Sequence, residues 1–461
     1  MSPGARPLRV AIVGTGPAGC YAAEHLLSRD DVAVEINMFD RLPTPYGLVR
    51  AGVAPDHPQT KKAARLFEWT AARPGVQMNL NVDIGRHLSH EELLAHHHAV
   101  VYAVGATRDR TLGIAGEDLP GSHGAGDFVG WYNGHPDHRT HTFDLSGQRA
   151  VIVGNGNVAL DIARILLLPP DALAVTDIAD HALTALRRSN LSEVVLLGRR
   201  GPTHAAFTSP ELLALGDLPD IDVVVEPPGI LADDSTSSAA IDTASSYSAR
   251  LKHSILREFA GRAATSHGRR IILKFLSSPM EILGDTRVDA VRIVRNHLVL
   301  NADGQFVTRP TTDTEVLQTS LVLRAIGYRA APIAGVPVDR RGGTIANIDG
   351  RVIDPSSQRP LSGVYTTGWS KRGPSGVIGT NKKCSLETVE SILNDHAKNL
   401  LPEPPRDLAD LDRLIAQRQP AVVDINAWRR IDASERRRGH ATGRPRVKFT
   451  RVEQMLAVAR T

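Results

Sequence analysis

Residues 10–19 read V-A-I-V-G-T-G-P-A-G, and this stretch decides the fold. Four apolar residues lead into a turn that contains Gly14, Gly16 and Gly19. The pattern is typical of a buried parallel strand that enters a helix through a dinucleotide-binding turn. Gly14 would permit the tight turn, Gly16 would let the backbone approach a pyrophosphate, and Gly19 would let the helix lie close to the strand. The helix N-terminus would add amide groups and a positive dipole.

Asp40 ends a second apolar strand, near residues 34–39. It follows the glycines at the offset where dinucleotide sites carry an acid that bonds the ribose hydroxyls. Taken alone, such an aspartate would be a surface residue after a strand. The glycine pattern before it favours the binding role.

Residues 150–159, A-V-I-V-G-N-G-N-V-A, repeat the strand-turn-helix pattern with Gly154, Gly156 and Ala159. Alanine is allowed at the third position of this fingerprint. Two complete patterns in one chain are much more specific than one. They predict two dinucleotide sites and therefore two different dinucleotides.

Arg199 and Arg200 follow the next apolar strand, residues 193–197, at the place where an NAD site would carry an acid. Arginine favours a ribose 2′-phosphate, because its guanidinium donates paired, charge-assisted hydrogen bonds. The second site should therefore hold NADP, and the first, with Asp40, a dinucleotide with free ribose hydroxyls. A solvated basic turn is the alternative interpretation.

Composition narrows the functional classes. The 461 residues are 42% hydrophobic and 23% charged, as in ordinary globular proteins, and exceed the length of one hydrophobic core. A net charge of +4 does not argue for nucleic-acid binding. No apolar run approaches the roughly 20 residues of a membrane span, so we expect no integral membrane segment. Cys20 and Cys384 form no zinc or redox motif, which fits a reducing cytoplasm.

No metal site is expected from the sequence. His135, His138 and His141 have ligand-like spacing, but they lie in a polar loop with no other clustered ligand. Residues 232–249 are rich in Ser, Thr, Ala and Asp and are expected to form an exposed insertion. Alternating patterns at residues 270–276, 288–294 and 297–300 suggest antiparallel strands.

Longer motifs identify a family. They are P-T-P-Y-G-L-V-R-A-G-V-A-P-D-H-P (43–58), G-N-G-N-V-A-L-D-I-A-R (154–164), G-R-R-G-P (198–202), A-A-F-T-S-P-E-L (205–212), G-W-S-K-R-G-P-S-G-V-I-G-T-N-K-K (368–383) and G-R-P-R-V-K (443–448). With them the chain resembles, nearly end to end, the adrenodoxin reductase type of NADPH–ferredoxin reductases, in particular the mycobacterial branch.

The resemblance implies an α/β fold with two Rossmann-like, three-layer dinucleotide-binding domains. The NADP-binding domain, residues 109–331, would be inserted in the FAD-binding domain, residues 1–108 and 332–461. FAD would occupy the first site and NADPH the second. Asp40 stands where the family more often has Glu, one methylene longer, so a ribose contact could pass through water.

The resemblance also implies site residues. Beside the turn residues Gly14, Gly16 and Gly19, the expected FAD contacts are Ala18, Asp40, Leu48, Val82, Trp369, Gly376, Val377 and Ile378. Beside Gly154 and Gly156, the expected NADPH contacts are Arg110, Asn155, Asn157, Val158, Arg199, Arg200, Glu211 and Gly376. Polar residues of the family near the flavin–nicotinamide junction match His57, Asp161 and Glu211.

The implied activity is hydride transfer from NADPH to FAD and then single-electron transfer to an iron–sulfur ferredoxin, which could serve cytochromes P450. The candidate docking residues are Arg250, Lys252 and Arg257, on a helix near residues 247–264; a solvated helix face is the simpler interpretation of their charge. Other functions stay open. They are a flavin-dependent NADPH oxidase or monooxygenase and a non-enzymatic dinucleotide-binding subunit. A disulfide reductase would need a redox-active cysteine pair, which the motifs lack.

Overall fold

The chain divides into two units in the computed structural model, which describes residues 6–231, 247–263, 268–302, 304, 306–339 and 342–461. The first unit contains the chain up to Arg108 together with residues 133–136 and 328–461, and the second contains residues 109–132 and 137–327. Of the insertion expected at residues 232–249, only the last three residues are described.

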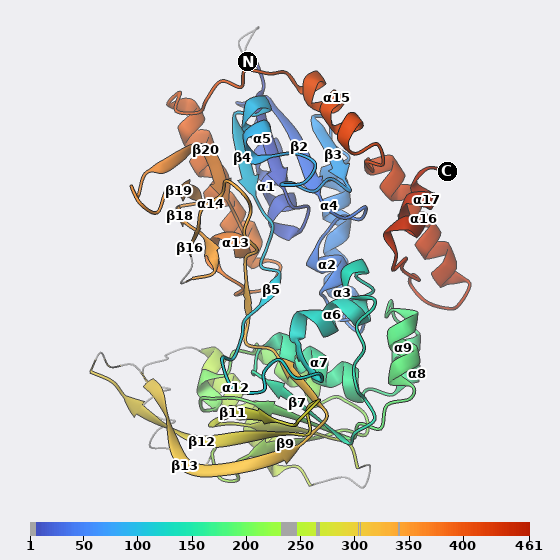
Figure 1. Ribbon diagram of the computed structural model, residues 1–461, viewed down its shortest axis with the longest axis vertical. Helices are drawn as coiled ribbons and strands as arrows, with labels where there is room; N and C mark the ends of the chain where they lie inside the picture. Colours follow the sequence, from blue (N-terminus) through green and yellow to red (C-terminus); the bar gives the residue numbers. More distant parts are fainter. Residues whose placement is uncertain (1–5, 232–246, 264–267, 303, 305, 340–341) are drawn as a thin grey trace. The chain divides into compact units, whose positions relative to one another are not determined.

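The first unit is built on a seven-stranded sheet in the order β18-β19-β20-β4-β1-β2-β3 (Figure 1). Its strands are β1 (Leu8–Val13), β2 (Val34–Asp40), β3 (Val76–Leu80), β4 (Ala99–Tyr102), β18 (Asn347–Ile348), β19 (Arg351–Ile353) and β20 (Pro360–Thr366). Strands β20, β4, β1, β2 and β3 are parallel, and β18 and β19 extend the sheet antiparallel.

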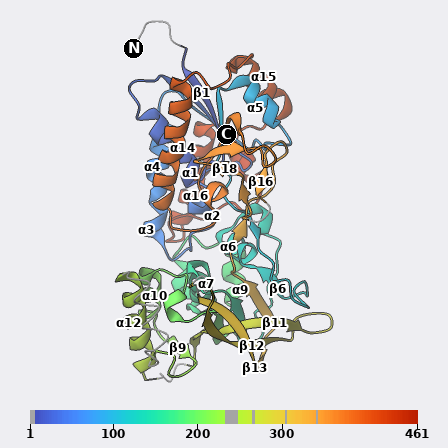
Figure 2. The ribbon, with the colours of Figure 1, turned by 90° about the vertical axis from the view of Figure 1, so that its left-hand side faces the viewer.

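Alternate residues of β1 enter two different cores. Val10 and Ile12 face one core, and Ala11 and Val13 face the other. Because successive side chains of a strand point to opposite faces, both faces of this sheet are covered. The long helix α14 (Thr380–Ala397) lies along α1 (Pro17–Leu27) on one of them (Figure 2).

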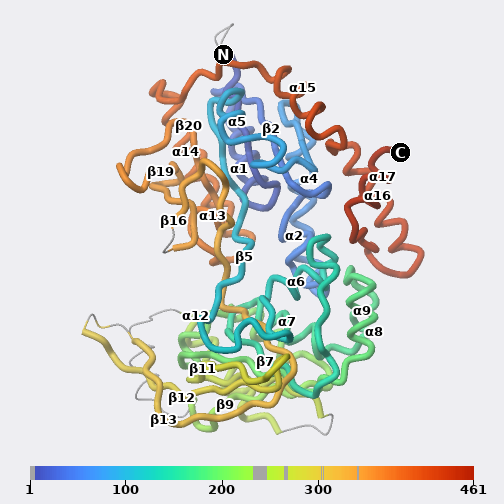
Figure 3. Tube along the Cα trace, in the orientation of Figure 1, coloured from blue at the N-terminus to red at the C-terminus, as the bar shows by residue number. Residues whose placement is uncertain are grey.

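The remaining helices of this unit are α2 (Leu48–Ala51), α3 (Pro58–Lys61), α4 (Ala63–Ala71), α5 (His90–His96), α13 (Trp369–Arg372), α15 (Leu408–Arg418), α16 (Ile425–His440) and α17 (Val452–Ala459). The last three follow one another in red beside the blue N-terminal part (Figure 3). Short strands β16 (Val338–Asp339) and β17 (Thr344–Ile345) pair with each other.

The second unit has a six-stranded parallel sheet in the order β6-β14-β7-β8-β10-β9. Its strands are β6 (Ser122–Gly124), β7 (Arg149–Val153), β8 (Glu193–Leu197), β9 (Asp222–Glu226), β10 (Arg270–Lys274) and β14 (Leu321–Arg324). The antiparallel arrangement expected for residues 270–276 is wrong. Strand β10 lies between two parallel neighbours, β8 and β9, and its buried Ile271, Ile272 and Leu273 form the apolar run of a central strand.

Helices cover one face of this sheet and a small antiparallel sheet covers the other. Ala150 and Ile152 of β7 face the helical core, whereas Val151 and Val153 face Val291 and Ile293 of the small sheet. The helices are α6 (Ala125–Asn133), α7 (Asn157–Leu167), α8 (Pro170–Ala174), α9 (Asp180–Leu186), α10 (Ser209–Leu215) and α12 (Tyr247–Gly261), and the antiparallel strands are β11 (Ser277–Leu283), β12 (Ala290–Leu300) and β13 (Phe306–Gln318). Each unit therefore has three layers.

Candidate functional site

The two glycine turns share one backbone arrangement. Gly14 has φ +104°, and a Cβ there would lie 2.4 Å from the carbonyl oxygen of Ala103. Gly154 has φ +124°, and its Cβ would lie 2.3 Å from the carbonyl oxygen of Ala325. In both units, the strand next to the turn comes so close that only glycine fits at the first position.

The middle glycines have a different environment. A Cβ on Gly16 would have its nearest neighbour at 3.9 Å, the Cα of Gly47, and a Cβ on Gly156 would have its nearest at 4.0 Å. Both glycines are the N-caps of eleven-residue helices, α1 and α7. Because the protein leaves space there and the first-turn amides of a helix have no partner within it, each turn offers a cradle for a phosphate.

Asp40 is bound to the first turn. Its Oδ2 accepts hydrogen bonds from the amide of Thr15 at 3.1 Å and from the Thr15 hydroxyl at 2.6 Å. Its Oδ1 accepts from the amide of Leu42 at 3.1 Å. Burial raises the pKa of this carboxyl, although these hydrogen bonds act in the opposite direction. The aspartate thus fixes the turn, and its remaining lone pairs are the ones a ribose or a bridging water could use.

The loop of residues 43–58 meets the turn from the other side. A Cβ on Gly47 would lie 3.1 Å from the Cα of Gly16, and the amide of Tyr46 donates to the carbonyl of Thr15 at 3.1 Å. Tyr46 has φ +79°, which is rare for a bulky residue and is held by its contacts with Trp428, at 5.9 Å between ring centroids. Leu48, which follows, is 46% exposed.

The segment of residues 368–378 reaches the same place from far along the chain. Gly368 lies against Ala18, since its Cβ would be 2.5 Å from the Cβ of that residue. The hydroxyl of Ser385 on α14 donates to the carbonyl of Ala18 at 2.9 Å. Val377 is 54% exposed, so two apolar side chains, those of Leu48 and Val377, are available to cover a planar ring. The structure therefore gathers residues expected for FAD around one end of the first sheet.

The rest of that set lies close to these elements. Val82 is buried and its amide donates to the carbonyl of Asp40 at 2.8 Å. The indole of Trp369 stacks on Tyr328 at 6.2 Å and donates to the carbonyl of Ser375 at 3.2 Å. Gly376 has φ +77° and precedes Ile378, which is packed against the core.

In the second unit, Asn155 and Asn157 of the glycine turn accept hydrogen bonds from a neighbouring segment of the chain. The amide of Thr208 donates to Oδ1 of Asn157 at 2.8 Å, and the amide of Phe207 donates to the carbonyl of Asn155 at 3.1 Å. Val158 is partly buried against the helical core. These contacts fix the segment of residues 205–208, which leads into α10, to the glycine turn.

Arg199 and Arg200 have no carboxylate partner among the described residues. Nε of Arg200 is buried without a hydrogen-bond partner there. Burial first, and then Arg200 and Lys252, lower the pKa of His204 beside them. A buried guanidinium nitrogen in a positively charged surrounding is the environment that a bound phosphate would complete.

Asp161 and Glu211 share a buried arginine that the sequence analysis did not single out. Arg164 on α7 is 2% exposed and its guanidinium lies 2.7 Å from Oδ1 of Asp161 and 3.5 Å from Oε2 of Glu211.

His57 belongs to the first unit, where it is the N-cap residue of α3. Arg110 stands where the chain enters the second unit, with its amide donating to the carbonyl of Gly327 at 3.0 Å.

A buried ion pair attaches the loop of residues 43–58 to the C-terminal part. Glu435 on α16 is fully buried and accepts two hydrogen bonds from Arg50, at 2.6 and 2.8 Å. Arg446 lies 3.2 Å from Glu435, and the amide of Phe449 donates to it at 2.9 Å. Burial would raise the pKa of Glu435, but Arg50 and Arg446 hold it below its usual value.

Cys20 and Cys384, the two cysteines of the chain, are free and buried. Burial, with Asp40 and Glu24 nearby, raises the pKa of the Cys20 thiol far above its usual range. Such a thiol is not a nucleophile.

The helices of the described residues include none with the length and apolar character of a membrane span.

Residues 8–195 match the family model described as pyridine nucleotide-disulphide oxidoreductase. The NADPH-ferredoxin reductase FprA of Mycobacterium tuberculosis is 45% identical over 462 residues, which cover 98% of this chain and 99% of that protein. The mitochondrial NADPH:adrenodoxin oxidoreductase of Arabidopsis thaliana is 40% identical, over 99% of this chain and 96% of that one. The solved structure of M. tuberculosis FprA in complex with NADPH superposes with a TM-score of 0.92 at 44% identity, over 99% of this chain and 100% of the other. The chain belongs to the adrenodoxin reductase type of ferredoxin–NADP reductases.

Proposed function

We propose that the protein is an FAD-dependent NADPH:ferredoxin oxidoreductase, with FAD in the first unit and NADPH in the second. The contrast between the two turns carries the proposal. Asp40 stands beside the first, whereas Arg200, whose buried Nε has no hydrogen-bond partner among the described residues, follows the strand next to the second. A carboxylate accepts from ribose hydroxyls, whereas arginine selects a 2′-phosphate. The names of the relatives support NADPH as the reductant and a ferredoxin as the acceptor.

The first unit would bind FAD. Gly16 leaves space for the pyrophosphate, Leu48 and Val377 would cover the ring system, and Asp40 would bond the ribose. The full proposed set is Gly14, Gly16, Ala18, Gly19, Asp40, Leu48, Val82, Trp369, Gly376, Val377 and Ile378. When bound, FAD supplies the capacity to accept a hydride and release electrons singly.

The second unit would bind NADPH at Gly156, with Arg199 and Arg200 on the 2′-phosphate. The full proposed set is Arg110, Gly154, Asn155, Gly156, Asn157, Val158, Arg199, Arg200, Glu211 and, from the first unit, Gly376. Asn155 and Asn157 act through the segment they bind, residues 205–208, and so are positioning residues for Glu211.

We assign His57, Asp161 and Glu211 to the surroundings of the reacting atoms. Arg164 is a positioning residue, because its buried guanidinium lies beside both carboxylates and orients them. The chain then contributes orientation, exclusion of water and fixed charge, and it needs no covalent nucleophile.

Purified protein separates this proposal from its rivals. We expect a yellow protein that reduces ferricyanide with NADPH and reduces cytochrome c only when a ferredoxin is added. NADPH binding without turnover would indicate a non-enzymatic dinucleotide-binding subunit. Reoxidation by oxygen at a rate that matches the turnover with NADPH, with no stimulation by ferredoxin, would indicate an oxidase or monooxygenase.

For ferredoxin docking we propose the exposed side of α12, with Arg250 and Arg257, and Lys252 beside them. Lys252 is half-buried and donates to the carbonyl of Ala205 at 2.9 Å, so the two arginines should carry most of the electrostatic effect. We expect Arg250→Glu with Arg257→Glu to reduce the rate of ferredoxin reduction about tenfold at low salt. Ferricyanide reduction should not change.

The matched control for docking is Arg287→Glu, an exposed arginine elsewhere in the second unit. Equal rates for the docking variant and this control, at every salt concentration, would exclude α12 as the docking surface. A variant that is slow with ferricyanide as well would point instead to damage of the nucleotide site.

The middle glycines provide a second prediction. Gly16→Ala should leave the free energy of unfolding of the apoprotein within about 1 kcal/mol of the parent, because the structure has room for the Cβ. The same methyl group would occupy the phosphate cradle, so the Kd for FAD should rise at least about tenfold, or 1.4 kcal/mol. Gly156→Ala is the matched variant, which should weaken NADPH binding and leave the FAD content unchanged. Full FAD affinity in Gly16→Ala would contradict the assignment of this turn.

The two free, buried cysteines favour a reducing compartment, and we propose the cytoplasm.

A further inference from the structure

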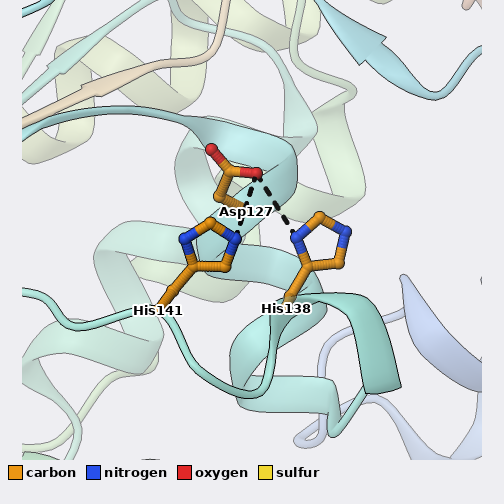
Figure 4. Close-up of side chains that lie close together, drawn as sticks. All are labelled: Asp127, His138 and His141. Carbon is orange, nitrogen blue, oxygen red and sulfur yellow. Dashed lines mark ion pairs between the residues drawn. The ribbon is translucent and has the colours of Figure 1, made fainter.

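Asp127, His138 and His141 converge in the second unit, outside both proposed nucleotide sites (Figure 4). Oδ1 of Asp127 lies 3.3 Å from Nδ1 of His138 and 3.7 Å from Nε2 of His141. One ligand atom from each residue lies within 4.8 Å of the other two. Asp127 is in the first turn of α6, and His138 ends the short 3-10 helix of residues 136–138.

These separations suit a metal ion better than hydrogen bonds alone. A tetrahedral zinc ion with bonds of about 2.1 Å places adjacent ligand atoms about 3.4 Å apart. A charge-assisted hydrogen bond between imidazolium and carboxylate would bring the atoms to about 2.8 Å. The observed 3.3 and 3.7 Å are close to the first spacing.

The surrounding residues hold the two imidazoles in place. A Cβ on Gly130, one turn after Asp127 on α6, would lie 2.4 Å from Cδ2 of His138, so the ring occupies space that only glycine leaves. The ring planes of His138 and His141 are at 22° to each other, with centroids 5.4 Å apart, and the rings lie side by side (Figure 4). His141 also contacts Phe143 at 6.2 Å, whose ring in turn lies 5.0 Å from that of Trp131.

The cluster is half-buried and keeps one side open to solvent. The exposed fractions of the side chains are 32% for Asp127, 27% for His138 and 35% for His141. Three protein ligands with an open fourth position are the arrangement of zinc sites that retain a water. Imidazole nitrogens with one carboxylate oxygen favour Zn²⁺ over Mg²⁺ or Ca²⁺, which take oxygen ligands.

We propose that Asp127, His138 and His141 bind one Zn²⁺ ion, with water completing its coordination. The sequence alone predicts no metal here, because the spacing of the histidines does not show that Asp127 lies beside them. Among the described residues, His135 of the same loop is not part of this group. The third ligand, Asp127, comes from the preceding helix α6. The ion would join the start of α6 to the segment of residues 138–141.

The test uses the full-length flavoprotein without a polyhistidine tag. The protein is stripped with a chelator and then titrated with Zn²⁺ against a chromophoric competitor, and bound metal is counted by mass spectrometry. We expect one ion per chain. Asp127→Asn, His138→Gln and His141→Gln should each raise the Kd for Zn²⁺ at least about tenfold. Loss of a residue that only supports a metal ligand already weakens metal binding by about that factor. His135→Gln is the control and should bind as the parent does.

A second measurement keeps the result independent of folding. Co²⁺ in the site should give the intense visible absorption of tetrahedral coordination in the parent and the control, and not in the three ligand variants. The metal-free variants should melt at the temperature of the metal-free parent. Sub-stoichiometric Zn²⁺, equal binding by all variants, or preference for Mg²⁺ would overturn the proposal.

Discussion

Replacing Arg199 and Arg200 together by alanine should raise the KM for NADPH about a hundredfold and change the KM for NADH less than about threefold. Hydrogen bonds to a charged group contribute about 1.5–3 kcal/mol each, and 1.4 kcal/mol corresponds to a factor of ten. Only NADPH carries the 2′-phosphate that would use them. Steady-state ferricyanide reduction with each nucleotide measures both values.

The control for this prediction is Arg188→Ala, another exposed arginine of the same unit, which should leave both KM values unchanged. The single variants separate the two roles. Arg200, with its buried Nε, should account for more of the effect than the exposed Arg199. An equal loss with NADPH and NADH would show that the arginines do not recognise the 2′-phosphate.

Glu435→Gln should lower the free energy of unfolding of the holoprotein by about 3–5 kcal/mol, since it leaves the charge of Arg50 without its buried partner. Arg50 belongs to the loop that carries Gly47 and Leu48, so FAD should dissociate more readily as well. Denaturant unfolding and release of flavin fluorescence measure the two effects. The control is Glu68→Gln. It removes the half-exposed ion pair between Glu68 on α4 and Arg429, which lies on α16 as Glu435 does, and it should lower the free energy of unfolding by less than about 1 kcal/mol.

The same pair gives a pH dependence. The pKa of Glu435 is lower in the folded protein than in the unfolded chain, so the unfolded state binds the proton more readily. Its contribution to stability is therefore full above the unfolded pKa, near 4.5, and is lost as the pH falls through the lower folded value. The stability difference between the parent and Glu435→Gln should shrink on acidification below this pH. A constant difference would show that the charge of Glu435 is not what stabilises the loop.

Local patterns were sufficient for the two turns. The buried strand β1 and the glycine turns that begin at Gly14 and Gly154 follow from a few adjacent residues, which is why the sequence predicts them. The start of helix α14 is harder to predict from the sequence. It begins at Thr380, directly after the glycine-rich segment, and its N-cap residue Gly379 has no side chain to mark the boundary.

Partners that come from other elements could not be predicted. Arg164 lies among apolar residues of α7, and nothing in the spacing shows that it meets Glu211 on α10. Asp127 and the two histidines come from a helix and a separate loop. Arg50 and Glu435 are both charged residues that a sequence places on the surface by default, and only the fold buries them together.

The pairing of Arg50 with Glu435 also affects how the protein is made. The two residues are 385 positions apart, so at roughly 5–20 residues per second a ribosome needs roughly 20–80 s to pass from one codon to the other. During that interval the loop of residues 43–58 has no buried carboxylate to hold it. Strand β20, which completes the parallel part of the first sheet beside β4, is synthesised late as well. The proposed flavin pocket is therefore finished only after residue 435 has been synthesised, and we expect the cofactor to be loaded after that step.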